Sequence, residues 1–223
     1  MFTPKTLEFL ELNHWMGSKE WFTEHKDEYL EYVQKPLYEL SNLLAPTVDK
    51  MDPLLVTDPR ISVSRIYKDM RFVKNGSPFR DMMWVSFRRD KKAYPCWPEF
   101  YVVFSPTTFF YGCGYYSARA EAMDEIRNLI FADDKQFLKA QKALEKQEQF
   151  ALEGDMYKRS KFPEQSEALR NWLDRKSVCF SCYPGIDEMF AENLAERIAE
   201  DIQKMKPVYD FLIYAENRVR QFE

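Results

Sequence analysis

The stretch EFYVVFSPTTFFYGCGYY, residues 99–116, decides the expected fold. Its two runs rich in aromatic and β-branched residues, EFYVVF and TFFYGCGYY, flank a Ser-Pro-Thr-Thr turn. This pattern is typical of two strands joined as a hairpin. Because strands joined by so short a connection pair antiparallel, we expect an antiparallel sheet built around this hairpin.

Further strand-like runs lie on both sides of the hairpin. ISVSRIY at 61–67 alternates between the two faces, and MMWVSFRR at 82–89 follows a strong turn signal, Asn-Gly-Ser-Pro at 75–78. KSVCFSCY at 176–183 is the last such run. We expect each of these runs to add a strand to the sheet.

Helical patterns occupy the N-terminal part of the chain. Thr3-Pro4 is typical of an N-cap followed by proline at the first helical position. Leu7, Leu10 and the pair Trp15/Met16 recur near helical spacing, and Gly17-Ser18 predicts a helix end and a new cap. The next helix has an apolar stripe over 22–44 that Pro36 kinks or splits, and a loop punctuated by Pro46, Pro53 and Pro59 follows.

Helical patterns return after the strands, over 117–131 with Ser117 as cap, 133–147 and 167–173. The clearest stripe runs from Phe190 to Leu212 at steps of three and four, with Pro207 bending it or starting a separate helix. Helices, then strands, then helices predict an α+β fold with a central antiparallel sheet packed by N-terminal helices and a long C-terminal helix. We expect a single domain over residues 1–223.

Composition narrows the class of protein. Apolar residues make up 45% of the 223 residues and aromatic residues 16%, so an ample core is expected. No apolar run approaches the ~20 residues that span a bilayer, and the N-terminus lacks an export signal, so no membrane partner is expected. Four cysteines without framework spacing favour thiols and a cytoplasmic location.

The basic segment RIYKDMRFVKNGSPFR, residues 65–80, is the candidate binding site. Residues 65–92 contain nine Lys or Arg and three Asp, a net charge of +6, whereas the whole chain carries −4. Guanidinium groups suit phosphate and carboxylate. We therefore predict a cationic strand–turn–strand that binds an anionic small molecule. The predicted contacts are Arg65, Arg71, Lys74 and Arg80. The alternative interpretation is a sheet face whose cations pair with acidic helices of the same chain.

Candidate catalytic groups are few, and whether the protein is an enzyme stays open. Tyr67 and Asp69 share the predicted strand face with the arginines and either orient them or supply polar chemistry. His25 or Asp69 is the candidate base if hydrolase or transferase chemistry occurs. His25 also lies four residues from both Trp21 and Tyr29, which favours a histidine packed among rings.

Other motifs predict no metal and no cofactor. Two histidines are too few for an ordinary metal site, and the Cys179/Cys182 pair lies in a predicted strand, where its members face opposite sides. Gly112-Cys-Gly114 fits close backbone packing better than an anion contact. Basic residues at 158–161 and 175–176 either face the first basic segment or form a solvated loop.

The segment from Arg65 to Arg80 also carries a family motif, RIY-x-D-x-RF-x-K-x-x-x-P-F-R. Together with FTPKTLEFL, GDMYKR and KPVYDFL in the same order, the chain resembles the microbial family of conserved hypothetical proteins called domain of unknown function 2461. The resemblance implies one α+β domain in the cytosol with no established activity. The chain departs from the family pattern at Gly76-Ser77, at the cysteine pair and at Trp84-Val85.

Two other functions stay open. Exposed Tyr and Phe beside the cations would allow binding of single-stranded nucleic acid or RNA, although the net acidity of the chain argues against this partner. A scaffold or protein–protein interaction domain would instead present the basic segment to an acidic partner as a large flat contact.

Overall fold

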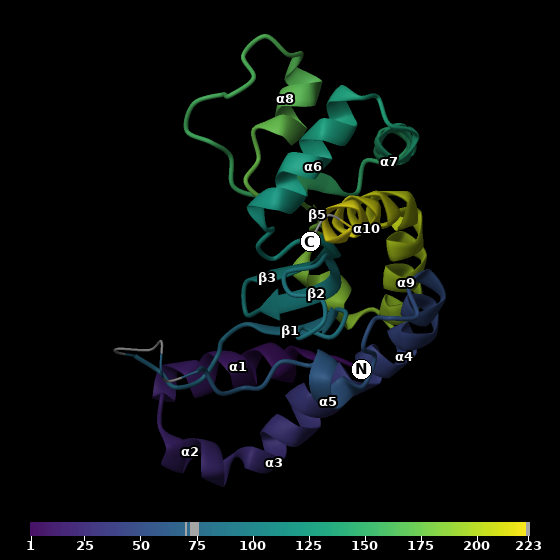
Figure 1. Ribbon diagram of the computed structural model, residues 1–223. Coiled ribbons are helices and arrows are strands. Elements are labelled where there is room, and N and C mark those ends of the chain that lie inside the picture. The colour runs from purple at the N-terminus through teal and green to yellow at the C-terminus, as the bar shows by residue number, and fades with distance from the viewer. Residues whose placement is uncertain (70, 72–75, 222–223) are drawn as a thin grey trace. The chain divides into compact units, whose positions relative to one another are not determined.

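The computed structural model describes residues 1–69, 71 and 76–221, and it confirms an α+β fold (Figure 1). Within the described residues the strands form one antiparallel five-stranded sheet of order β1-β2-β3-β5-β4. The strands are β1 (Met83–Phe87), β2 (Glu99–Ser105), β3 (Thr108–Gly114), β4 (Ala151–Glu153) and β5 (Cys179–Cys182). The hairpin predicted from residues 99–116 is therefore present as β2 and β3.

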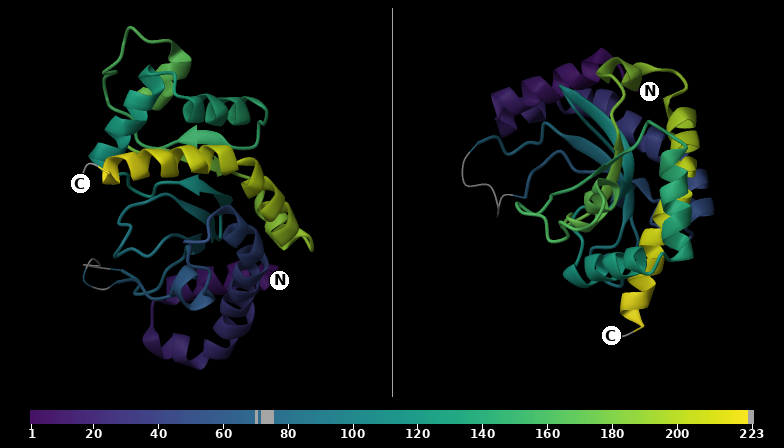
Figure 2. Two further views of the ribbon diagram at one scale, coloured as in Figure 1. Left: turned by 45° about the vertical axis from the view of Figure 1, so that its right-hand side comes forward. Right: turned by 90° about the horizontal axis from the view of Figure 1, so that it is seen from above.

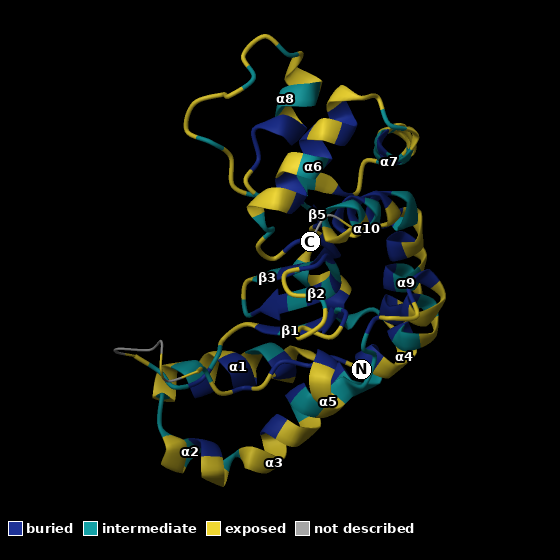
Figure 3. Ribbon diagram, in the orientation of Figure 1, coloured by how far each residue is buried: buried dark blue, intermediate teal, exposed yellow. Residues whose placement is uncertain are grey.

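The chain divides into two compact units that are described separately. The first comprises Met1–Phe87, Tyr101–Tyr111 and Tyr183–Ala199, and the second comprises Arg88–Phe100, Gly112–Cys182 and Glu200–Glu223. Helices of both units are buried along one face and exposed along the other, as amphipathic sequences require (Figure 3).

The first unit begins with a series of helices. They are α1 (Pro4–Met16), α2 (Lys19–Glu24), α3 (Lys26–Tyr29), a π-helical turn (Leu30–Gln34), α4 (Lys35–Met51) and α5 (Pro59–Ser62), and a 3-10 turn (Ile186–Phe190) follows later. The predicted boundary between α1 and α2 is confirmed. Gly17 ends α1 with a left-handed φ of 57°, and Ser18 caps α2 by accepting a hydrogen bond from the Trp21 amide at 3.2 Å.

The predictions made for the prolines of this region differ in how they agree with the structure. Pro36 lies in the first turn of α4, directly after the π-helical turn, so the predicted split of the helix is confirmed. The prediction of a loop at Pro46 is wrong, because Pro46 lies inside α4. Leu44 and Val48, on either side of it, are both fully buried, and their burial outweighs the hydrogen bond that the proline removes.

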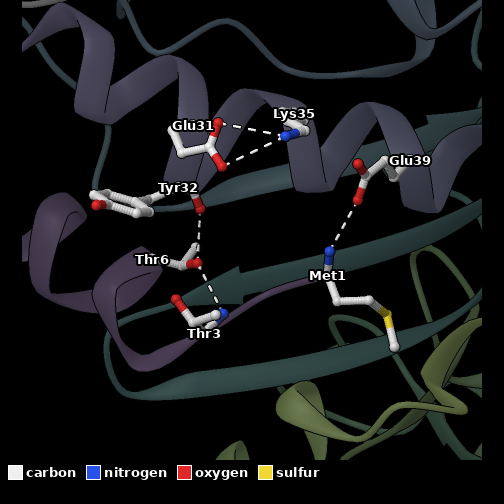
Figure 4. A network of polar contacts seen from close by, with 7 residues as sticks. All are labelled: Met1, Thr3, Thr6, Glu31, Tyr32, Lys35 and Glu39. Atoms are coloured by element: carbon white, nitrogen blue, oxygen red, sulfur yellow. Dashed lines mark hydrogen bonds and ion pairs between the residues drawn. The ribbon is translucent and has the colours of Figure 1, made fainter.

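Polar contacts tie the start of α1 to the helices that follow (Figure 4). The Thr6 hydroxyl donates to the Tyr32 carbonyl at 2.7 Å and accepts from the Thr3 amide at 3.2 Å. The Met1 ammonium pairs with Glu39 at 2.8 Å. These contacts fix α1 at its N-terminal end, and its C-terminal end leads to the candidate site.

The second unit contains α6 (Ala120–Phe131), α7 (Lys135–Glu145), α8 (Glu167–Leu173) and α10 (Lys206–Arg220). The predicted Ser117 cap is wrong, because α6 begins after Arg119. The predicted C-terminal helix is present in two parts. α9 (Leu194–Lys204) precedes α10, and Pro207 lies in the first turn of α10.

Aromatic rings form the core of the second unit. Phe137 of α7 lies 5.5 Å from Trp172 and 5.6 Å from Phe211 between ring centroids, and Trp172 lies 5.4 Å from Phe180. These rings join α7, α8, α10 and β5, which accounts for the high aromatic content. In the described part of the chain, we find no helix with the length and apolarity that crossing a membrane requires.

Candidate functional site

Two described parts of the basic segment, residues 65–69 and 76–80, lie side by side as an irregular antiparallel pair, and residues 65–80 are here called the basic hairpin. The strand predicted at 61–67 is wrong, because Asp58 caps the short helix α5 through the Arg60 amide at 2.9 Å and the chain extends only from Val63 onward. The two arms pair through the isolated bridge of Tyr67 with Phe79.

Two backbone hydrogen bonds fix the register of the arms. The Lys68 amide donates to Pro78 and the Arg80 amide donates to Ile66, both at 2.8 Å. These bonds place the backbone of Arg80 beside the first arm. Lys74, one of the predicted contacts, lies outside the described residues.

Aromatic side chains pack the root of the basic hairpin onto α2 and α3. The Phe22 ring lies 5.4 Å from Tyr67, 4.9 Å from Phe79 and 5.5 Å from Tyr29 between centroids. Burial, with Tyr38 nearby, raises the pKa of Tyr29 to about 12. Its phenol therefore stays protonated at neutral pH and serves as a hydrogen-bonding group of the core rather than as a base.

Arg71 forms an ion pair with Asp69, two residues before it. Its Nε and Nη2 donate to the Asp69 carboxylate at 3.0 and 2.6 Å, while the Arg71 side chain stays 81% exposed. Hydrogen bonds from the Arg71 side chain and backbone lower the pKa of Asp69 to about 2, and Arg65 adds to this effect. Arg71 lies in a turn and contacts Asp69 from two residues further along the chain, and Arg65 acts on Asp69 electrostatically, so a shared strand face of these three residues stays a prediction. A carboxylate with so low a pKa is a weak base.

Arg80 is placed differently from Arg71. Its guanidinium carbon lies 4.7 Å from the centre of the Trp84 ring, a cation–π geometry. Its Nε is buried and has no hydrogen-bond partner among the described residues. Arg80 therefore has a guanidinium oriented by the Trp84 ring and a buried donor that no described residue accepts.

His25 is packed, in agreement with the second interpretation of its sequence position. Its ring stacks on Trp21 with centroids 4.0 Å apart and planes 12° apart. Nδ1 lies 2.8 Å from the Trp21 carbonyl oxygen, and because a carbonyl only accepts, Nδ1 carries the proton. The ring is therefore fixed by its own helix.

The end of α1 contains Asn13, which the sequence analysis did not single out. Asn13 is fully buried, and neither its amide nitrogen nor its amide oxygen has a hydrogen-bond partner among the described residues. Gly17, one turn later, lies against Ser77 of the basic hairpin. A polar residue in the buried stripe Thr6, Phe9, Leu10, Asn13 was the signal that could have identified it.

The remaining motifs have structural explanations. A Cβ on Gly114 would lie 2.5 Å from the Cys179 Cα, which supports close backbone packing. Arg175 is buried and donates to the carbonyls of Gly154 and Leu152 at 2.6 and 2.9 Å, so it holds loop backbone in place.

The structure also bears on disulfide bonds and on possible metal sites within the described residues. All four cysteines fall within them, and there we find no disulfide bond. The described residues also contain no group of three or more His, Cys, Asp or Glu that could hold a metal ion.

Comparison with known proteins assigns this chain, with its α+β fold and basic hairpin, to a family. The family model described as conserved hypothetical protein (DUF2461) matches residues 5–211. The chain belongs to that family. No curated protein matches it.

Proposed function

We propose that the basic hairpin binds an anionic small molecule bearing a phosphate or a carboxylate. The observation that carries this proposal is Arg80, whose guanidinium is oriented over Trp84 and whose buried Nε lacks a hydrogen-bond partner among the described residues. A buried donor without an acceptor costs free energy, and a bound anion would remove that cost.

The other arginines would complete the contact. Arg65 and Arg71 both lower the pKa of Asp69, so their positive charges also act at this position. An anion that binds here would be attracted by these charges and would lie beside the carboxylate that pairs with Arg71. Lys74 keeps its place in the proposal from the sequence alone. The packed ring of His25 and the low pKa of Asp69 favour binding over hydrolase or transferase chemistry. The absence of disulfides among the described residues favours a reducing, cytoplasmic setting.

Thermal shift tests the proposal through Arg80→Gln. The probes are inorganic phosphate, glycerol phosphate, succinate and citrate, each tested up to millimolar concentration. A probe at 100 times its Kd should raise the melting temperature by about 5–10 °C in the wild type, and the shift should disappear in the variant, which loses the oriented charge.

Arg60→Gln is the matched control for this test. Arg60 pairs with Asp58 at 2.6 Å in the same local arrangement as Arg71 with Asp69, but it lies outside the basic hairpin. Its shift should equal that of the wild type. The absence of any anion response in the wild type, or an equal loss in both variants, would rule out the site.

Asp69→Asn should tighten anion binding by about two- to fivefold. The change removes a carboxylate that competes for Arg71, and exposed ion pairs of this kind are weak, so the gain is small. Titration calorimetry with the best probe measures it. Asp58→Asn should leave the affinity unchanged, and a weaker affinity for Asp69→Asn would mean that Asp69 positions Arg71 for the ligand instead.

Single-stranded nucleic acid is a second candidate, favoured by two exposed rings. Trp15 at the end of α1 is 84% exposed and Tyr67 is 45% exposed, so both could stack on bases. Binding of an oligonucleotide that falls steeply with salt and is lost in Trp15→Ala would support this candidate over the small molecule.

A further inference from the structure

An open pocket of about 430 Å³ lies where α7, the end of α9 and the start of α10 meet, all within the second unit. The rings of Phe137 and Phe211 hold α7 against α10 with their centroids 5.6 Å apart, and Figure 2 shows the two helices side by side. None of the described residues that line the pocket is acidic, and four of them are lysines: Lys139, Lys142, Lys146 and Lys204.

The three lysines of α7 form a row on one side of the helix. Lys139, Lys142 and Lys146 follow one another at steps of three and four residues, and all three are exposed. Because an α-helix rises 1.5 Å per residue, the row covers about 10 Å of α7. Within the described residues, none of the three forms an ion pair or a side-chain hydrogen bond.

Other cations close to the pocket are paired with carboxylates. Lys204, at the end of α9, donates to Asp201 at 2.7 Å. Lys206, at the start of α10, donates to Asp210 at 2.7 Å. The lysine row of α7 therefore differs from its surroundings, because its positive charge is not compensated by the described part of the chain.

A purely structural role accounts for only part of this row. Lysines near the C-terminus of a helix are favoured by the helix dipole, which explains Lys142 and Lys146. Lys139 lies before the last turn of α7, where this effect has faded. Like charges three and four residues apart destabilise a helix, so the row carries a repulsion that a bound anion would remove.

We infer that this pocket binds a small polyanion that carries a diphosphate or triphosphate group. The ammonium group of lysine is a point charge with three donors, which suits phosphate oxygens. A row that covers about 10 Å favours a ligand with several phosphates over a single anion. The pocket also has the volume of an ordinary small-molecule site. The inference is independent of the proposed function, because none of these lysines belongs to the basic hairpin.

The rim of the pocket is fixed before any ligand binds. The Gln147 side chain donates to the Phe150 carbonyl at 3.0 Å and accepts from the Phe150 amide at 2.6 Å, which holds the loop after α7. Lys204 also donates to Gln149 at 3.2 Å. A ligand would therefore meet a formed site and would order little of the chain beyond the α7 lysine side chains.

The variant that tests the inference carries Lys139→Gln, Lys142→Gln and Lys146→Gln together. Titration calorimetry with tripolyphosphate is run at about 0.15 M salt, where long-range attraction is screened. The wild type should bind, and the variant should bind about tenfold more weakly or worse, because it loses the charged donors. Its melting temperature should not fall, since glutamine and lysine have similar helix propensities and all three positions are exposed.

Two further probes define the ligand class. Orthophosphate should bind the wild type about tenfold more weakly than tripolyphosphate, because it reaches only part of the row. ATP distinguishes the two sources of a triphosphate group. Tighter binding of ATP than of tripolyphosphate would assign the pocket to a nucleotide, and weaker binding would assign it to an inorganic polyphosphate. Orthophosphate that binds as tightly as tripolyphosphate would contradict the inference.

A matched control removes the same charge elsewhere in the second unit. It carries Lys158→Gln, Arg159→Gln and Lys176→Gln, which are all exposed, and it should keep the affinity for tripolyphosphate. Arg80→Gln should keep it as well. Absence of binding in the wild type, or an equal loss in both triple variants, would overturn the inference. A loss in Arg80→Gln alone would place the ligand at the basic hairpin. A single-stranded oligonucleotide that binds through the α7 lysines when tripolyphosphate does not would also overturn it.

Discussion

Replacing Gly114 with alanine is expected to destabilise the protein by about 4 kcal/mol or more, a large part of the ~5–15 kcal/mol that ordinarily favours the folded state. Gly114 has a φ of 135°, and an added Cβ would lie 2.5 Å from the Cys179 Cα and 2.7 Å from the Val178 carbonyl oxygen. These neighbours are backbone atoms. They cannot withdraw without breaking the hydrogen bond from the Tyr115 amide to Val178, which is 2.9 Å long.

Chemical denaturation followed by circular dichroism measures this effect. Gly185→Ala is the control, since nothing lies within 4 Å of the added Cβ and its φ is not in the left-handed region, so its stability should change by less than about 0.5 kcal/mol. A Gly114→Ala protein that unfolds at nearly the wild-type denaturant concentration would show that β3 and β5 are not so closely apposed.

Gly154 gives a second example of a glycine backbone that packs closely against the segment before and at the start of β5. Its Cβ would lie 2.0 Å from the Ser177 carbonyl oxygen, so glycines crowd residues 177–179 from two places in the chain. The sequence analysis favoured close packing at Gly112-Cys-Gly114. It could not name the partner, because Gly114 and Cys179 are far apart in the sequence and only the strand order brings them together.

Local signals predicted the parts of the fold that depend on near neighbours. The hairpin at 99–116, the helix end at Gly17, the Ser18 cap and the break at Pro207 each follow from a turn, a cap or a proline within a few residues. Such features are decided by backbone conformation and by hydrogen bonds close in sequence.

Features that depend on packing between distant segments could not be predicted from the sequence in the same way. Trp15 and Met16 seemed part of the apolar stripe of the first helix, yet both are exposed and the buried polar residue is Asn13. The spacing of apolar residues was compatible with more than one buried face of the first helix. The contacts of α1 with the rest of its unit determine which face is buried. The Pro46 prediction is wrong for a similar reason, because burial of the α4 stripe overrides a local helix breaker.

The candidate site was predictable only where it is local. Alternation predicted a strand face shared by Arg65, Asp69 and Arg71, whereas the structure has Arg71 in a turn whose amide and side chain contact Asp69, and Arg65 and Arg71 both lower the pKa of Asp69. The apposition of Gly17 and Ser77 could not be predicted, since residue spacing gives no measure of distance between segments so far apart in the chain.

Replacing Phe79 with alanine is expected to cost about 3–5 kcal/mol of folding free energy, the range for a buried ring removed from a core. Phe79 is fully buried and lies 4.9 Å from Phe22 and 5.1 Å from Tyr67 between ring centroids. The variant leaves a cavity beneath the basic hairpin and removes the contact between the Phe79 and Tyr67 rings. Denaturant unfolding gives the free energy, and Phe79→Leu, which fills part of the volume, should lose less.

Trp15→Ala is the control, because that ring is larger yet 84% exposed, and its loss should change stability by less than about 0.5 kcal/mol. The same Phe79→Ala protein tests how the site depends on the fold. If the proposed anion site depends on the packing of Tyr67 and Phe79 against Phe22, anion affinity should fall by at least tenfold at temperatures where the variant is still folded. Retained affinity would mean that the arms hold their register through the Lys68–Pro78 and Arg80–Ile66 backbone hydrogen bonds alone.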